Sequence, residues 1–362
     1  MKVDGIKWML FIIAGAFVAI TLFPGRPLAK EPEEIWRELD KLSGEERQKR
    51  ILAGASAEGK VVFYVNLSAD HVEPLRLDFE RRYPMMKFEF WRAPGEKTSN
   101  RVLTEARAQK FAADVIGPGN EHVPLLVGSK LIGRYNSPER RFYAEEHKDQ
   151  EGYWTSVAYN LAIIAYNTKL VPAAEAPRRH DDFLRPKWKG NFAIDMEPDR
   201  VLMVWLKSWG EEKTEKFLAG LIKNDAVVRK GHSLLTQLLC AGEFKVAIEL
   251  YAYRVAEMKH KGCPIDLIYP DPTPGAVTPV VVARHSPHPY AAALLVDYLL
   301  SEPGQKILAE RGWLSGRRGV KSKYPDLDIE AKGVKVSLLR PEDADRFGKK
   351  YEELRERFLL RR

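Results

Sequence analysis

The chain has 362 residues, of which 45% are hydrophobic and 30% charged, and its formal net charge at pH 7 is +8. This length suffices for two domains of ordinary size, each with its own core. The basic residues are spread along the sequence rather than gathered in a stripe, and no nucleic-acid-binding motif is present, so we expect no nucleic-acid partner.

Residues 1–29 have the pattern of an export signal. A short, mildly basic leader precedes an apolar run from Trp8 to Phe23, which ends at Pro24-Gly25. Such a segment is either a cleaved signal peptide or an uncleaved N-terminal membrane anchor, and its sequence leaves both open. In either case we expect the remaining chain in the periplasm, soluble or tethered to the outer face of the inner membrane.

The next segment, residues 30–58, is predicted to form a helical collar, in which Ser43 and Glu46 make a capping box. Strand-like runs then alternate with helical segments at about 73–82 and 99–111. The strand-like runs are KVVFYVNLS, KFEFWRA and ADVIGPG. This alternation predicts a parallel sheet flanked by helices.

The same alternation resumes beyond residue 150. A long strand is predicted at 154–168, and further strands in PKWKGNFAID, KVAIELYA and VVVA. Two helices end this part of the chain, where Ser301 caps the second helix and Gly312 stops it. The other predicted helices lie at about 199–208, 212–223 and 232–241.

The simplest arrangement of these elements is two α/β lobes joined by two extended crossings, one near 154–168 and one near 265–278. A cleft between lobes on such hinges suits the capture of a ligand. After the collar, the predicted parts are lobe 1 at 59–155, lobe 2 at 156–270, the return to lobe 1 at 271–330, and a C-terminal helical extension at 331–362.

Cys240 and Cys263 are the only cysteines of the sequence. In an oxidising compartment such a pair forms a disulfide if the two thiols come within bonding distance, which the sequence does not decide. Without paired histidines nearby, a zinc site is not expected.

Motifs of known catalytic sites are absent, among them HExxH, GxSxG, GxGxxG and the P-loop. Asp70-His71 and His180-Asp181-Asp182 fall in polar stretches without a visible nucleophile, so we interpret them as surface loops. We therefore expect no enzyme, no catalytic residue and no cofactor.

Residues 288–320 read HPYAAALLVDYLLSEPGQKILAERGWLSGRRGV, and RVLTEARA, AYNTKLV, PKWKGNFAI and AGEFKVAI precede them in order. Together these strings resemble the extracellular solute-binding proteins of ABC importers, a family that includes ferric-type members. The resemblance covers residues from about 40 to 320. It implies an α/β fold of the two-lobed periplasmic-binding-protein type, class II, with the ligand bound in a cleft between lobes joined by two hinge crossings.

The ferric members of that family hold iron with a histidine, a glutamate and two adjacent tyrosines, a set rich in hard oxygen donors. The resemblance places the histidine at Ser68, the glutamate at Gly119 and the first tyrosine at Leu250. Only the second tyrosine is kept, as Tyr251, although Tyr253 and Glu249 stand nearby. Ferric iron therefore remains an alternative that requires a non-standard site with Tyr251 as a metal ligand.

Loops at the carboxyl ends of strands supply the candidate ligand-binding residues, because open α/β sheets bind ligands there. Helix N-termini at such loops favour an anionic group, and Arg92 and Arg254 suit a bidentate contact to a carboxylate or phosphate. The candidates are Asn66, Ser68, Arg92, Thr98, Ser99, Asn120, Tyr159, Asp195, Glu197, Tyr251, Tyr253 and Arg254.

These features predict a monomeric solute receptor that captures a small solute, preferably an anionic organic one, by hinge closure. Its expected partner is an ABC permease in the inner membrane, to which the closed form delivers the solute. A membrane-tethered solute sensor of the same fold remains a second alternative.

Overall fold

The computed structural model describes residues 30–360, except for the side chains of residues 199 and 200. From Glu31 onward these residues form one compact unit. The export segment expected at residues 1–29 lies outside the described residues. Among the described helices, none is long and apolar enough to cross a membrane.

Lobe 1 is built around a mostly parallel sheet whose central strand is apolar. Its strands are β1 (Lys60–Val65), β2 (Lys87–Arg92), β3 (Val115–Ile116) and β4 (Ile132–Gly133). Its helices and 3₁₀ turns are α1 (Pro32–Leu39), α2 (Gly44–Glu58), α3 (Ala69–Arg82), α4 (Gly95–Arg107), η1 (Asn120–His122), α5 (Val123–Gly128), η2 (Pro138–Phe142), η3 (Glu145–His147), α10 (Pro289–Leu300) and α11 (Glu302–Ala309). β1 lies between β2 and β3, parallel to both. Val61, Phe63 and Val65 of β1 are at most 1% exposed, as expected for a strand covered on both faces.

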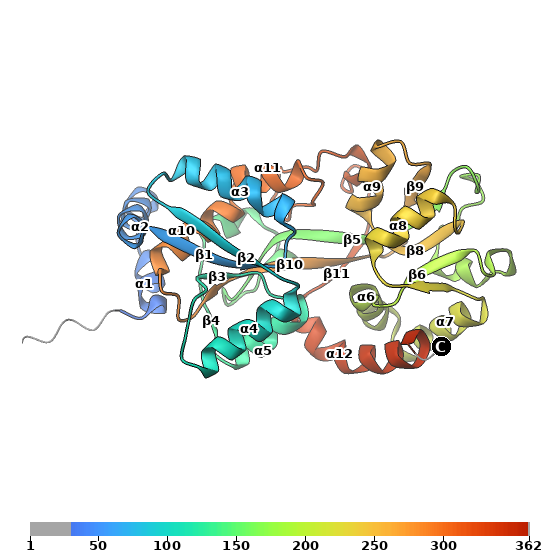
Figure 1. Cartoon of the computed structure of the whole chain (residues 1–362), viewed down its shortest axis with the longest axis horizontal. Coiled ribbons are helices and arrows are strands. Elements are labelled where there is room, and N and C mark those ends of the chain that lie inside the picture. The colour runs from blue at the N-terminus through green and yellow to red at the C-terminus, as the bar shows by residue number, and fades with distance from the viewer. Residues whose placement is uncertain (1–29, 361–362) are drawn as a thin grey trace, which may run out of the picture. The chain divides into compact units, whose positions relative to one another are not determined.

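Two long strands, β5 (Thr155–Asn167) and β10 (Thr273–Ala283), run side by side between the lobes (Figure 1). They pair antiparallel from Gly275↔Leu161 to Val280↔Thr155, and all 13 residues of β5 are buried. The first predicted crossing is confirmed. The second was predicted too early, because β9 (Ile265–Ile268) only pairs with the lobe 2 end of β5. Pro270 and Pro272 separate β9 from β10, since proline cannot donate a ladder hydrogen bond.

Lobe 2 contains a second parallel set of strands. Its elements are η4 (His180–Leu184), η5 (Pro186–Trp188), β6 (Phe192–Asp195), α6 (Asp199–Trp209), α7 (Glu211–Lys223), β7 (Val227–Arg229), α8 (His232–Ala241), β8 (Val246–Tyr251) and α9 (Ala252–His260). β6 lies between β7 and β8, parallel to both, and β8 pairs with β5. A disulfide joins Cys240 at the end of α8 to Cys263, with 5.6 Å between their Cα atoms, which resolves the question that the sequence left open.

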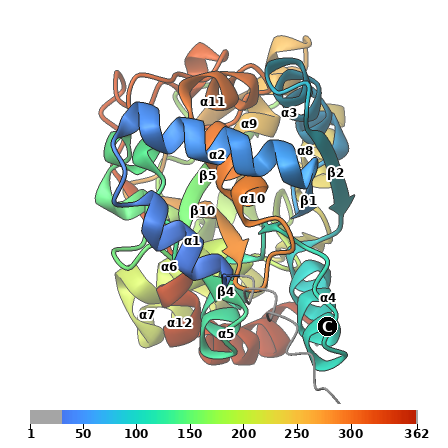
Figure 2. The same ribbon diagram turned by 90° about the vertical axis from the view of Figure 1, so that its left-hand side faces the viewer.

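The collar helices α1 and α2 pack on α10 at the outer end of lobe 1 (Figure 2). Trp36 is fully buried, and its indole N–H donates to the carbonyl oxygen of Pro289 at 2.9 Å. Ser43 is the N-cap of α2, but its side chain makes no capping hydrogen bond. The predicted capping box is therefore wrong, although the helix starts where the sequence places it.

Some helix ends lie where the sequence predicts them and others do not. Ser301 caps α11, with its hydroxyl accepting a 3.4 Å bond from the amide of Gly304, and Gly312 follows with a left-handed φ of +89°. Both features were predicted. By contrast, α4 begins at Gly95 and α3 at Ala69, each four residues before the predicted start, because both helices begin directly at the loops that follow their strands.

The C-terminal segment contains a strand as well as a helix. After η6 (Pro325–Leu327), β11 (Val336–Leu339) pairs in parallel with β10, and α12 (Pro341–Arg355) follows, ending in the π-helical turn η7 (Glu356–Leu360). α12 starts against η1 and α5 of lobe 1 and then packs on α6 of lobe 2, as Figure 1 shows. The segment therefore contacts both lobes. At the lobe 1 end, Trp154 Nε1 donates to Glu342 Oε1 at 3.1 Å.

Candidate functional site

The carboxyl ends of the parallel strands carry most of the candidate residues. In lobe 1, β1 leads to Asn66 and Ser68, β2 ends at Arg92, and β3 leads to Asn120. In lobe 2, the corresponding ends carry Asp195 after β6, and Tyr251, Tyr253 and Arg254 after β8. The structure therefore places these candidates at the carboxyl edges of the two sheets.

At the lobe 1 edge, Ser68 is the N-cap of α3, and its hydroxyl lies 2.6 Å from Nδ1 of His71. The interpretation of Asp70-His71 as a surface loop is wrong, because both residues lie in the first turn of α3 and His71 is only 8% exposed. Burial lowers the pKa of His71, and the positive charge of Arg311 acts in the same direction. The imidazole is therefore mostly neutral at pH 7.

Trp313 links this edge to lobe 2. The His71 ring meets the indole of Trp313 edge to face, with centroids 5.6 Å apart, and Tyr253 stacks on the other side of the site at 5.2 Å from the same indole. Tyr251 lies parallel to Tyr253 at 6.1 Å. Beyond it, the ring of His232 lies 3.9 Å from that of Tyr251. We name this set, His71, Trp313, Tyr253, Tyr251 and His232, the aromatic row.

The aromatic row ends at two buried carboxylates. His232 Nδ1 lies 3.6 Å from Asp195 Oδ2 and 3.7 Å from Glu249 Oε2. The Glu249 carboxylate also accepts the backbone N–H of Asp195 at 2.7 Å, while Asp195 accepts the amides of Glu197 and Gly231, each at 2.9 Å. Burial raises the pKa of Asp195, which is 2% exposed. Both carboxylates thus fix the loops that hold the row.

A cavity of about 10 Å³ lies beside these carboxylates, bordered by His232, Glu249, Tyr251 and Asn160. This volume is about that of one water-sized probe. This cavity therefore holds at most a group of about the size of one water molecule.

Four lobe 1 candidates are tied into the backbone. Thr98 and Ser99 are fully buried inside α4, where their hydroxyls donate to the carbonyls of Ala93 at 3.4 Å and Gly95 at 2.9 Å. The side-chain amides of the two asparagines also serve the fold: Asn66 donates to Pro118 O at 3.0 Å and Asn120 to Leu339 O at 2.9 Å. Each asparagine keeps a buried Oδ1 without a hydrogen-bond partner.

The remaining candidates differ in whether their side chains already form ion pairs or hydrogen bonds within the protein. Arg92 is exposed at the end of β2. Arg254 is paired with Glu257 at 2.6 Å through Nη1, but its buried Nε has no partner. Glu197 is paired with Lys230 at 2.8 Å. Tyr159 is 8% exposed, and burial raises its pKa.

The sequence missed His232 and Trp313. Neither lies in a recognisable motif, and both gain their position only when segments far apart in the sequence fold together. Among the described residues, no group of three or more His, Cys, Asp or Glu side chains is arranged to hold a metal ion. At Gly119, where the resemblance implies a glutamate, a side chain would collide with Glu121 and His122.

Comparison with known proteins agrees with this geometry. The family of bacterial extracellular solute-binding proteins matches residues 122–329, more than half of the chain. The Fe(3+)-binding periplasmic protein of Serratia marcescens is 22% identical over 265 residues, which cover 70% of this chain and 77% of that protein.

Two solved structures share the fold. Iron-bound HitA from Pseudomonas aeruginosa has a TM-score of 0.72 at 22% identity, over 83% of this chain and 99% of HitA. AfuA from Actinobacillus pleuropneumoniae, with exogenous fructose-6-phosphate bound, has a TM-score of 0.65 at 20% identity, over 82% and 99% of the two chains. The expected two-lobed periplasmic-binding-protein fold is thus confirmed, and the chain belongs to the family of bacterial extracellular solute-binding proteins.

Proposed function

We propose that this protein is the substrate-binding component of an ABC importer and that it captures a small organic anion. The observation that carries the choice of solute is the aromatic row with arginines beside it. Trp313 and Tyr253 offer a stacked aromatic surface, and Arg254 stands next to Tyr253 in the first turn of α9. Aromatic faces with a nearby guanidinium suit a carboxylate or phosphate on an organic body.

The positive charge at this edge supports the same choice. Arg254 and Arg311 both lower the pKa of His71 by their charge, which places them within electrostatic reach of the row. Arg254 is partly neutralised by Glu257, but its buried Nε still lacks a partner. A ligand oxygen would satisfy that donor and remove the cost of leaving it unpaired.

Ferric iron is the second candidate, and a specific observation favours it. Tyr251 and Tyr253 lie side by side and offer two phenol oxygens, and the Serratia relative is a ferric-binding protein. Against iron stands the loss of the other donors, since Ser68 and Gly119 occupy the positions of the family's histidine and glutamate. The known structures of this fold include both an iron-bound member and one with a sugar phosphate.

The proposed cycle needs no chemical step. The open receptor binds the solute on the row, the lobes close around it by bending at β5 and β10, and the closed form docks on the permease. Closure is driven only by the difference in solute affinity between the two forms. We propose that this occurs in the periplasm, with a monomer that is either free or held by its N-terminal segment.

A binding screen tests the solute class. The full chain is titrated with sugar phosphates, dicarboxylates and phosphonates, and in parallel with ferric citrate. At about 100 times the dissociation constant, a true ligand adds roughly 2.7 kcal/mol of stability, which is easily seen in thermal unfolding. Stabilisation by an organic anion without iron supports the proposal, whereas a response confined to ferric salts overturns it in favour of iron.

Two variants at one position separate the candidates further. Tyr251→Phe removes one phenol oxygen but keeps the ring, so it should weaken an iron–tyrosinate absorption band, to which Tyr253 would still contribute, while changing organic-anion affinity by less than about tenfold. Tyr251→Ala removes the ring and should weaken either ligand. If Tyr251→Ala keeps full affinity in a folded protein, Tyr251 does not contact the solute.

A further inference from the structure

A larger cavity also borders the crossing strand β5. Asn160 borders the small cavity beside His232, whereas its neighbour Tyr159 borders a cavity of about 640 Å³. We name this second space the hinge groove. It shares only Tyr159 with the residues that the sequence nominates, and it is separate from the aromatic row.

The walls of the hinge groove come from several parts of the chain. η3 of lobe 1 and the crossing strand β5 form one side, and β11 with Lys207 of α6 forms another. The segments 314–322 and 327–330 complete it. An occupant of the groove would therefore contact lobe 1, the hinge and the C-terminal segment at the same time.

The buried part of the groove wall includes a histidine whose Nδ1 has no hydrogen-bond partner. His147 is 7% exposed, its ring lies 4.8 Å from the ring of Tyr159, and its Nδ1 has no hydrogen-bond partner. A Cβ at Gly316 would lie 2.6 Å from the imidazole, so the loop can pass this close only as glycine. Burial lowers the pKa of His147 to about 4, so at pH 7 the ring is neutral and offers one donor and one acceptor.

The exposed part of the groove wall includes an arginine without an ion-pair partner among the described residues. Arg318 is exposed, its backbone N–H donates to Phe142 O at 3.0 Å, and its guanidinium forms no ion pair within residues 30–360. Glu146 and Glu330 also border the groove, and each would repel the anionic group of a ligand. Such a group is therefore expected beside Arg318 rather than beside either glutamate. The other cations are paired: Arg317 with Glu139, Lys321 with Asp328, Lys207 with Asp343 and Arg340 with Glu342.

The lining mixes polar and apolar side chains, and its apolar residues include Leu314, Leu327, Ile329, Val334 and Val336. From this combination we infer that the hinge groove is a second binding site, which takes a small organic anion with an aromatic or apolar body. The anionic group pairs with Arg318, the body rests on the apolar lining and the ring of Tyr159, and a polar substituent meets His147.

The groove is lined by residues of lobe 1, of the hinge strand and of lobe 2. A bound ligand would therefore change the free-energy difference between the open and closed forms. A ligand that fits the groove in one lobe arrangement stabilises that arrangement and changes the affinity of the aromatic row for its own solute. The coupling is reciprocal, so the solute changes groove affinity by the same factor.

The test is calorimetric titration of the full chain with phenyl phosphate, with inorganic phosphate and phenol as the two halves of the probe. We expect one phenyl phosphate per chain with a dissociation constant below about 1 mM, and weaker binding of either half. Arg318→Glu reverses the charge that this residue brings to the groove, and Ser322→Trp fills the groove from a partly buried loop position. Each should weaken binding at least about tenfold. Lys323→Glu, an exposed neighbour that does not border the groove, is the matched control and should bind as the wild type does.

Tyr251→Ala separates the two sites. Phenyl phosphate bound in the hinge groove keeps its affinity in this variant, while a solute on the aromatic row loses it. Binding that survives both Arg318→Glu and Ser322→Trp but is lost in Tyr251→Ala assigns the probe to the row and overturns the groove proposal. Absence of any phenyl phosphate binding overturns it as well, without affecting the proposed function of the row.

Discussion

Trp313 stacks on Tyr253 with ring centroids 5.2 Å apart and planes 17° from parallel, although Trp313 follows α11 of lobe 1 and Tyr253 lies in the first turn of α9 in lobe 2. The same indole receives the edge of His71 from α3. One tryptophan thus joins the two lobes at the proposed site, so its surroundings depend on how the lobes meet.

We expect Trp313→Ala to lower the free energy of unfolding by about 3 kcal/mol, because truncating a packed tryptophan removes buried area and leaves a cavity. Solute affinity should fall in the same variant, since the stacked surface is lost. Urea unfolding followed by circular dichroism measures the first effect and calorimetry the second. Trp313→Phe, which keeps an aromatic ring, should lose less of both. Equal losses in the two variants would contradict the stacking argument.

The disulfide between Cys240 and Cys263 closes a loop with a sequence separation of 23. Cross-linking a loop of this length should contribute about 3 kcal/mol, mainly by restricting the unfolded chain. We expect the double variant Cys240→Ser, Cys263→Ser to unfold at a correspondingly lower urea concentration. Added reductant should destabilise the wild type and leave the double variant unchanged, and a double variant that still responds to reductant would show that the bond is not the cause.

The collar is fastened to lobe 1 by a buried charge. Arg47 of α2 pairs with Asp297 of α10 at 2.7 Å and also bonds the hydroxyl of Tyr135. Removing one partner of a buried pair leaves the other charge uncompensated, so Asp297→Asn should cost about 3 kcal/mol in the free energy of unfolding.

The matched control for the collar pair is an exposed pair on α7, Glu212 with Lys216 at 2.6 Å. Glu212→Gln should leave the unfolding midpoint unchanged, because solvent screens exposed pairs. The collar argument fails if Asp297→Asn is as harmless as this control.

His180 makes stability depend on pH. It is 6% exposed and packs edge to face against the stacked rings of Trp205 and Trp209, and burial lowers its pKa to about 3. Below about pH 6.5 the unfolded chain binds a proton that the folded chain refuses, so stability falls as pH drops from there towards the folded pKa. The slope should be about 1.4 kcal/mol per pH unit for this one group. Denaturation curves at a series of pH values should show a shallower slope for His180→Phe.

The pKa of His288 is shifted in the opposite direction, so its contribution to stability should depend on pH with the opposite sign. Its hydrogen bond to the buried Asp114, 2.9 Å from Nδ1, raises its pKa. The stability it contributes is present below the unfolded pKa and is lost as pH rises through the folded one. His288→Gln should therefore lower the free energy of unfolding below the unfolded pKa and remove the decline that the wild type shows as pH rises through the folded one. A variant that keeps this decline would contradict the assignment.

Much of the fold follows from patterns within single segments. The apolar run of β1, the long strand β5 and the cap at Ser301 each depend on neighbours in the sequence, and the structure confirms them. The second crossing could not be placed, because strand content alone does not show that Pro270 and Pro272 divide β9 from β10. The strand β11 was missed for a related reason: four residues carry too little periodicity, and only pairing with β10 makes them a strand.

The candidate site divides in the same way. Strand ends predict that Ser68, Asp195 and Tyr251 lie at the carboxyl edges of the sheets, where the structure places them. They do not reveal that Trp313 and His232 stand between them, since these side chains meet the row only through tertiary packing. Sequence patterns also cannot show that Thr98 and Ser99 are buried inside α4, because this depends on where the helix begins.

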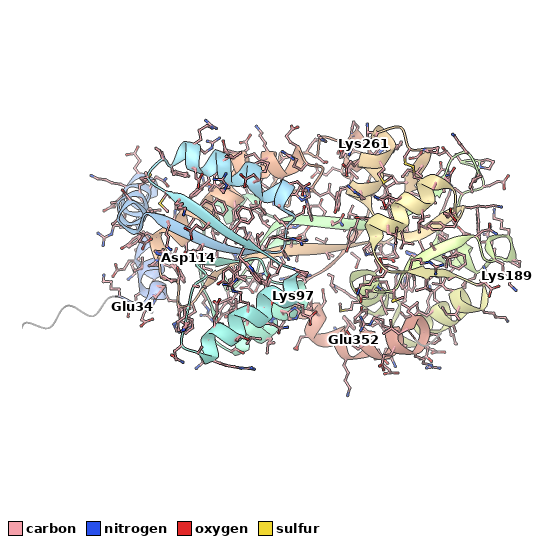
Figure 3. The ribbon with its side chains drawn as sticks, in the orientation of Figure 1. Glu34, Lys97, Asp114, Lys189, Lys261 and Glu352 are labelled. Carbon is pink, nitrogen blue, oxygen red and sulfur yellow. A yellow bond between two sulfur atoms is a disulfide. The ribbon has the colours of Figure 1, made fainter. Side chains whose placement is uncertain are left out.

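The C-terminal segment has a practical consequence. The chain starts its described course on α1 of lobe 1, and α12 ends with Tyr351 and Leu354 in the core of lobe 2. Glu34 on α1 and Glu352 on α12 are both exposed, and Figure 3 labels them on these two helices. A donor and an acceptor dye attached at these positions would each move with a different lobe. Energy transfer between them would report the proposed opening and closing in real time, with both labels far along the sequence from the proposed solute-binding residues.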